Sequence, residues 1–243
     1  MDRISKHISG QILGDRRNRE LGELIAINNA MFQQNLGIIL GGAAPNVFLP
    51  LLMIPAGLLM FPALGILETL DQARSHHPPT ILYWLMYGGS AIIGLLLYMF
   101  VKLGLTSILL KISKGERPGF SEFKNNHAAY RNFLAANILV FLSVATGLVC
   151  FVVPGIILGC KLAFTPLLVL DRGMGPFEAM QESCSLTYGQ CWKIFFASSA
   201  YHIINAIVSC IPLLGLAGSL VALPYYEMLI CTIYGTRTGE LAA

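Results

Sequence analysis

Long apolar runs without charged side chains dominate this chain. The residues from Leu24 to Leu67 include no Asp, Glu, Lys or Arg, and neither do those from Thr80 to Val101. A transmembrane helix needs about 20 consecutive apolar residues, so both runs are long enough to cross a bilayer. The pattern predicts an all-α, polytopic membrane protein with six transmembrane helices, whose passes lie within Leu24–Leu67, Thr80–Leu110, Phe133–Phe151, Ile156–Leu170, Ile194–Cys210 and Leu213–Tyr234.

Basic residues set the direction of these passes, because Lys and Arg concentrate on the cytoplasmic side of a membrane. Met1–Glu23 has five of them and Leu110–Arg131 has another five, so both segments are expected in the cytoplasm, with an even number of passes between them. Thr80–Leu110 is one pass, so Leu24–Leu67 crosses only once, and its prolines predict a kinked or partly unwound helix. Of 16 Lys and Arg residues only Arg74 falls in an external turn, and both termini are predicted to be cytoplasmic.

The N-terminal segment is basic and amphipathic. Ile4, Ile8 and Ile12 recur at helical spacing among basic residues, which is typical of a helix on an anionic lipid surface. A solvated basic tail is the alternative. No apolar core with a small-residue cleavage site occurs here, so a cleaved signal peptide is not expected. We therefore divide the chain into a cytoplasmic basic amphipathic segment (1–31), a six-pass transmembrane domain (32–238) and a cytoplasmic tail (239–243).

Two predicted cytoplasmic turns have the same layout. Each joins a Pro/Gly break to a short amphipathic helix that precedes a pass, one at Arg117–Phe123 and the other at Met174–Met180. Pro176 suits the first turn of the second helix, and Gly189 can end it. The apolar faces of these interfacial helices supply four candidate contact residues, which are Phe120, Phe123, Phe177 and Met180.

The shared layout also suggests internal repetition. The pentapeptide Gly-Ile-Ile-Leu-Gly occurs at 37–41 and again at 155–159. Together with the two similar turns, it indicates three parallel repeats, each an interfacial helix followed by a two-pass hairpin. The glycines of these GxxxG stretches allow helices to approach closely, and we expect that packing to be within the chain.

Composition supports a membrane location and argues against several other classes. Only 12% of the residues are charged, about half the ~25% of ordinary soluble domains. The net charge of +3 does not indicate nucleic-acid binding, because the basic residues flank apolar runs, where topology explains them. The six cysteines include no CxxC pair, so neither a metal nor a disulfide site is expected. No phosphate loop, HExxH, GxSxG or dense carboxylate pair occurs, so we predict no enzymatic activity and no cofactor.

Four ionisable side chains lie inside predicted passes at matching depth. Lys102, Lys161, His202 and Glu227 each lie nine or ten residues from the charged cytoplasmic end of their pass, which is roughly 14 Å at 1.5 Å per residue. Such groups usually face protein or a water-filled cavity. With Asn205, one turn deeper than His202, they form a candidate polar layer in which Glu227 pairs with Lys161 or Lys102. The layer is either a cavity for a headgroup or ion, or a structural pair that fixes helix register while the lysines reach toward the interface.

The second half of the chain carries a recognisable pattern. It consists of Pro154-Gly155-Ile156, Lys161, Pro166, Asp171, Gly173, Glu178-Ala179, Ser183, Leu186-Thr187, Gly189 and Trp192, with Gly115–Ser121 before it and Ile233–Arg237 after it. In these residues the chain resembles the YciC-type family of bacterial inner-membrane proteins, and also the membrane domain fused to some bacterial glycerophosphoryl diester phosphodiesterases. The resemblance covers about 110–238 and reaches the first 100 residues only in hydropathy.

The resemblance implies a six-pass, all-helical protein of the bacterial cytoplasmic (inner) membrane. It implies little about activity, because that family is largely of unknown function with suggested roles in the cell envelope. In the phosphodiesterases a separate soluble domain performs catalysis, and we expect no such domain here.

Two functions remain open at this point. The first is a non-enzymatic membrane protein that supports envelope assembly or serves as a scaffold for a membrane complex, with the interfacial helices as its contact surface. The second is a small transporter or lipid-handling protein that uses the polar layer. The expected partners are membrane lipids together with a membrane-protein partner or a second copy of the chain, and not nucleic acid.

Overall fold

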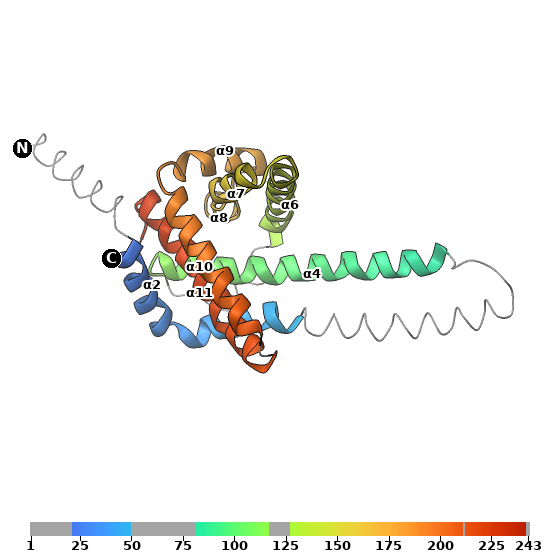
Figure 1. Cartoon of the computed structure of the whole chain (residues 1–243), viewed down its shortest axis with the longest axis horizontal. Helices are drawn as coiled ribbons and strands as arrows, with labels where there is room; N and C mark the ends of the chain where they lie inside the picture. The colour runs from blue at the N-terminus through green and yellow to red at the C-terminus, as the bar shows by residue number, and fades with distance from the viewer. Residues whose placement is uncertain (1–20, 50–80, 117–126, 211, 242–243) are drawn as a thin grey trace, which may run out of the picture.

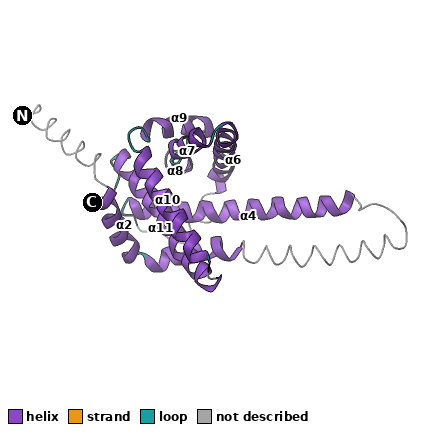
Figure 2. Ribbon diagram, viewed as in Figure 1, coloured by secondary structure: helices purple, strands orange, loops and turns teal. Residues whose placement is uncertain are grey.

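The computed structural model describes residues 21–49, 81–116, 127–210 and 212–241, and every regular element within these ranges is a helix (Figures 1 and 2). The helices are α2 (Leu21–Gln34), α4 (Ile81–Ser113), α6 (His127–Cys150), α7 (Val152–Lys161), α8 (Thr165–Arg172), α9 (Pro176–Leu186), α10 (Cys191–Ser209) and α11 (Pro212–Thr238), and a further apolar helix spans Leu36–Leu49. The predicted all-α class is therefore confirmed.

Three helical stretches are long and apolar enough to cross a membrane, namely Gly88–Ser113, Ala129–Cys150 and Val152–Arg172. They correspond to the second, third and fourth predicted passes. α10 and α11 occupy the positions of the fifth and sixth, but neither is among these three stretches. In α10, Lys193, His202 and Asn205 lower the hydropathy. The structure thus supports a multi-pass membrane protein with three candidate spans rather than the full set of six.

The first predicted pass is described only in part. α2 ends at Gln34 and a second helix spans Leu36–Leu49, while residues 50–80 lie outside the described part of the chain. α2 buries Leu24, Asn28 and Phe32. These residues face α11, where the ring of Phe32 meets that of Tyr225 edge-on at 5.3 Å. The N-terminal part of the chain therefore packs on its C-terminal helix.

α11 is the central helix of the assembly. It packs against α10, α4 and α2 (Figure 1), whereas α6 to α9 gather on one side of α4. The core forms where α4 and α11 meet α6 and the α7–α8 segment, and its fully buried side chains include Leu105 and Ile108 of α4, Met228 and Tyr234 of α11, Phe133 of α6 and Phe164 between α7 and α8.

The hairpin of α6 and α7 depends on a close backbone approach at Gly155. A Cβ atom added there would lie 2.6 Å from the backbone nitrogen of Leu148, which leaves no room for a side chain. The equivalent test at Gly37 finds open space. Packing within the chain therefore explains the second GxxxG stretch at Gly155 but finds no support at Gly37.

The fourth predicted pass is not one continuous helix. α7 ends at Lys161, a short turn follows, and α8 begins at Thr165. Pro166 accounts for the break, because proline has no N–H to donate to the carbonyl of Leu162 and its ring crowds that carbonyl. The chain tightens instead, with the Thr165 N–H donating to the Leu162 carbonyl at 3.1 Å.

Candidate functional site

Two buried hydroxyls, one in α9 and one on the residue just after it, hydrogen-bond to the backbone at the break between α7 and α8 and seal it. Ser183 Oγ donates a hydrogen bond to the Lys161 carbonyl at 2.7 Å and accepts one from the Phe164 N–H at 3.2 Å. Thr187 Oγ1 lies 3.2 Å from the same carbonyl. Both side chains are fully buried. The break frees backbone groups that would be costly to bury unpaired, and α9 supplies their partners.

This contact fixes the orientation of α9. Ala179 and Ser183 are buried against α6 and α8, and the helix runs from Pro176 to Leu186, close to the predicted boundaries. Gly189 then turns the chain toward α10 with a positive φ of 79°. Arg237, near the end of α11, donates a hydrogen bond to the Tyr188 carbonyl at 3.1 Å, which holds the segment just after α9.

An ionic cluster joins the C-terminal ends of three helices. Lys114, just after α4, forms ion pairs with Asp171 of α8 and with Glu240, just after α11. The Tyr234 hydroxyl of α11 donates to the second oxygen of Asp171 at 2.7 Å. The Asp171 side chain is only 8% exposed, whereas that of Glu240 is 45% exposed. Asp171 is therefore the buried centre of the cluster, and Glu240 is at its edge.

The charge of Lys114 is stabilised in this cluster. Burial by itself would lower the pKa of the Lys114 ammonium, but its hydrogen bonds and charge interactions with Asp171 and Glu240 outweigh burial and raise that pKa above its ordinary value of 10.5. Lys114 is consequently a fixed cation at neutral pH. The cluster can hold three helix ends together, and none of its groups resembles a nucleophile aimed at a substrate.

The structure brings together two members of the predicted polar layer. Lys102 Nζ of α4 lies 3.8 Å from Glu227 Oε1 of α11, which is one of the two pairings that the sequence left open. Lys161 instead lies at the end of α7, half-buried, and forms no ion pair with any described residue. The remaining pairing, between Lys161 and Glu227, is therefore not the one that forms.

His202 and Asn205 lie on α10, about one helical turn from each other, and they line different hollows. His202 is exposed, and its ring contacts that of the adjacent Tyr201 edge-on. It lines a hollow of about 570 Å³ between α6, α7 and α10. Asn205 lines a different hollow. The five predicted residues thus do not line one common cavity, because similar depth along the helices does not fix the direction in which each side chain points.

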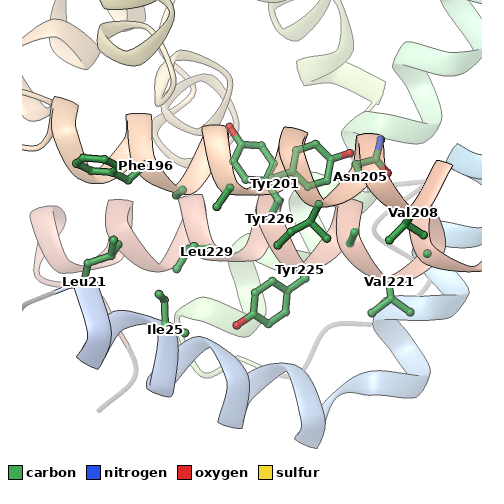
Figure 3. Close-up of a pocket in the computed structure, with 15 residues that line it drawn as sticks. Leu21, Ile25, Phe196, Tyr201, Asn205, Val208, Val221, Tyr225, Tyr226 and Leu229 are labelled. Atoms are coloured by element: carbon green, nitrogen blue, oxygen red, sulfur yellow. The ribbon is translucent and has the colours of Figure 1, made fainter. Parts of the chain in front are cut away.

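The hollow that includes Asn205 has a volume of about 500 Å³ and lies between α2, α10 and α11 (Figure 3). Its walls are mostly aliphatic and aromatic, with Ile25, Phe196 and Leu229 among them. Tyr226 lines both hollows and stacks on Tyr201 at 4.7 Å, so the tyrosine pair forms the partition between them. Such walls suit an apolar chain better than a polar solute.

Two of the four predicted interfacial contact residues, Phe177 and Met180, lie in the described part of the chain. Phe177 is 70% exposed on the outer face of α9, as a contact residue requires, and Met180 beside it is half-buried. Exposed aromatic rings continue along the chain at Tyr188 and Trp192. Phe120 and Phe123 lie outside the described residues.

Within the described ranges no group of three or more His, Cys, Asp and Glu side chains is placed to hold a metal ion. No protein-family model, curated protein or solved structure matches the chain. The geometry of the residues therefore carries the functional argument.

Sequence reasoning missed the cluster around Asp171 and the seal at Ser183. Their residues were visible, since Asp171 and Ser183 belong to the sequence pattern noted between Pro154 and Trp192, but nothing in that pattern states what each one contacts. The available signal for the contact at Ser183 was Pro166, which interrupts an apolar run and is followed by two hydroxyl residues, Ser183 and Thr187, in the next predicted helix.

Proposed function

We propose that this chain is a non-enzymatic integral protein of the bacterial inner membrane, with six passes and both termini in the cytoplasm, which supports envelope assembly or serves as a scaffold for a membrane complex. The observation that carries the proposal is the placement of α9. Its inner face is locked onto the membrane domain through Ser183 and Thr187, while Phe177 projects outward. A helix fixed on one side and apolar on the other is a preorganised contact surface.

The helix ends support the proposed topology. The C-terminal ends of α4, α8 and α11 meet at Asp171, and in a six-pass arrangement these are the ends of the second, fourth and sixth passes. Even-numbered passes all end in the cytoplasm when the N-terminus is cytoplasmic. The same arrangement fits three parallel repeats, each of which would end at this cluster, and membership of the YciC-type family is part of the proposal.

The test is purification of the full chain from native membranes in mild detergent, followed by mass spectrometry of the proteins and lipids that accompany it. We expect a protein partner in fixed stoichiometry that is lost from the double variant Phe177→Ser/Met180→Ser. Gln181→Ala, an exposed polar position on the same helix, is the matched control and should retain the partner. A partner that survives the double variant would refute α9 as the contact surface.

A lipid-handling or transport role is the second candidate, and the apolar hollow between α2, α10 and α11 favours it. Here the same purification should yield one enriched lipid and no stoichiometric protein. Replacing Ala200, which lines the hollow, with Leu should reduce that lipid without affecting a partner bound at Phe177. Lys161 does not line this hollow, so Lys161→Ala serves as the control and should retain the lipid.

A further inference from the structure

Glu227 is an acidic side chain that the proposed scaffold function does not use. It lies in the middle of α11, and its side chain is 18% exposed. Its Oε2 atom is buried, and no described group lies within hydrogen-bonding distance of it. Its Oε1 atom lies 3.8 Å from Lys102 Nζ, which is an ion-pair distance but too long for a hydrogen bond.

This arrangement is expensive for a carboxylate. A buried charge is tolerated when close pairing and hydrogen bonds replace the water that it has lost, and Glu227 has one long ion pair and one oxygen without a partner. Asp171 provides the contrast within the same protein, since Lys114 pairs with one of its oxygens and the Tyr234 hydroxyl donates to the other. The surroundings of Asp171 therefore stabilise a negative charge, whereas those of Glu227 do so only weakly.

Lys102 does not compel Glu227 to be charged. Its side chain is 31% exposed, so the ammonium can turn outward on its long stem when the carboxyl is neutral. The other titratable groups that face Glu227 are Tyr201 from α10 and Tyr226 and Cys231 from α11 itself. All three are neutral in their ordinary state, so Lys102 is the one cation among the described neighbours that favours the carboxylate.

We infer that Glu227 is a reversible proton-binding site inside the membrane domain, at which a carboxyl group exchanges with a carboxylate paired to Lys102. Proton uptake at Oε2 removes the unsupported charge and frees Lys102. Carboxyl groups with these surroundings are those that pumps and transporters use to couple protons to other events. The inference goes beyond the scaffold function and does not depend on α9, so the partner experiment neither supports nor overturns it.

Dicyclohexylcarbodiimide provides the test, because this apolar reagent modifies carboxyl groups that are both protonated and in apolar surroundings. The full chain is reconstituted in vesicles of phosphatidylethanolamine and phosphatidylglycerol, treated with the reagent across the pH range in which it stays folded, and analysed by peptide mass spectrometry. We expect an adduct on Glu227 that increases as the pH falls. Glu182, which is 37% exposed, is the internal control and should remain unmodified.

The Lys102→Met variant sharpens the test. Removing the cation withdraws support for the carboxylate, so half-maximal modification of Glu227 should occur at a proton concentration at least about tenfold lower than in the unaltered chain. Absence of an adduct on Glu227, or an adduct independent of pH, would overturn the inference. Protection by sodium chloride but not by choline chloride would also overturn it, since a metal cation would then be the ligand.

Discussion

Lys114→Met is predicted to be among the most destabilising single substitutions in this protein. It removes the cation from Asp171 while leaving that carboxylate 92% buried and without a charged partner. Removing one member of a buried ion pair costs about 3–5 kcal/mol. Two effects place the cost toward the lower end, because the Tyr234 hydroxyl still donates to Asp171 and because the carboxyl can take up a proton instead. Protonating an ordinary Asp at pH 7 costs about 4 kcal/mol, which caps the loss.

Glu240→Gln is the matched comparison at the other end of the same cluster. Glu240 pairs with the same ammonium, but its side chain is 45% exposed, and exposed pairs contribute about 0–1 kcal/mol. Lys114→Met should therefore lower the free energy of unfolding severalfold more than Glu240→Gln, although each variant removes an ion pair between Lys114 and an acidic residue. For a chain of this size, 3–4 kcal/mol corresponds to a fall of roughly 6–16 °C in melting temperature.

The assay is thermal unfolding in detergent with a thiol-reactive fluorescent dye, for which the buried thiols of Cys160 and Cys231 are the reporters. The double variant Lys114→Met/Asp171→Asn should recover most of the lost melting temperature, because it no longer buries an unpaired charge. If the double variant is as unstable as Lys114→Met alone, or if Glu240→Gln is equally damaging, the argument from the burial of Asp171 is wrong.

Three further predictions concern pH and the helix connections. Because folding raises the pKa of Lys114, the stability difference between the unaltered chain and Lys114→Met should persist from neutral pH up to pH 10.5 and decline as the pH rises through the higher folded-state pKa. Melting measured as a function of pH would show this decline. Ser183→Ala should lower the free energy of unfolding by about 1–3 kcal/mol, because it leaves buried backbone groups unpaired. Hydrogen exchange should then show lost protection at the Phe164 amide. Unchanged protection would mean that Ser183 does not stabilise the break between α7 and α8. Gly155→Ala should unfold the α6–α7 hairpin or displace Leu148, while Gly37→Ala, where a Cβ has open space, should be neutral or slightly stabilising in the same melting assay.

The sequence predicted the helical class and the short helix that begins at Pro176 and ends before Gly189 because these follow from local patterns. Apolar runs, a proline at the first helical turn and a glycine at the end act within a few residues of one another. The same local reasoning located the fourth pass but did not foresee the turn that divides it into α7 and α8. Pro166 was present in the run, but whether a proline kinks a helix or ends it depends on whether another segment can satisfy the freed backbone groups. Here Ser183, seventeen residues further along the chain, satisfies them.

The sequence pattern around residues 154–192, on which the proposed family membership rests, consists largely of residues to which the structure gives architectural roles. Gly155 permits the close α6–α7 approach, Pro166 ends α7, Asp171 is the centre of the ionic cluster, and Ser183 and Thr187 seal the break. A resemblance based on such residues carries information about how the helices are connected. It carries little about chemistry, because none of these side chains is both exposed and reactive.

The polar layer shows which part of a membrane site a sequence can specify. Counting residues from a charged helix end gives the depth of a side chain, since every residue advances the helix by about 1.5 Å. It does not give the direction in which the side chain points relative to the other helices, because that depends on how each helix is rotated and which neighbours it packs against. Lys102 and Lys161 were equivalent by depth, yet only Lys102 is on the helix that meets α11 beside Glu227. Helix packing therefore decides which of the two lysines pairs with Glu227. The same packing leaves the Oε2 atom of Glu227 without a partner, which is the observation behind the proposed proton site.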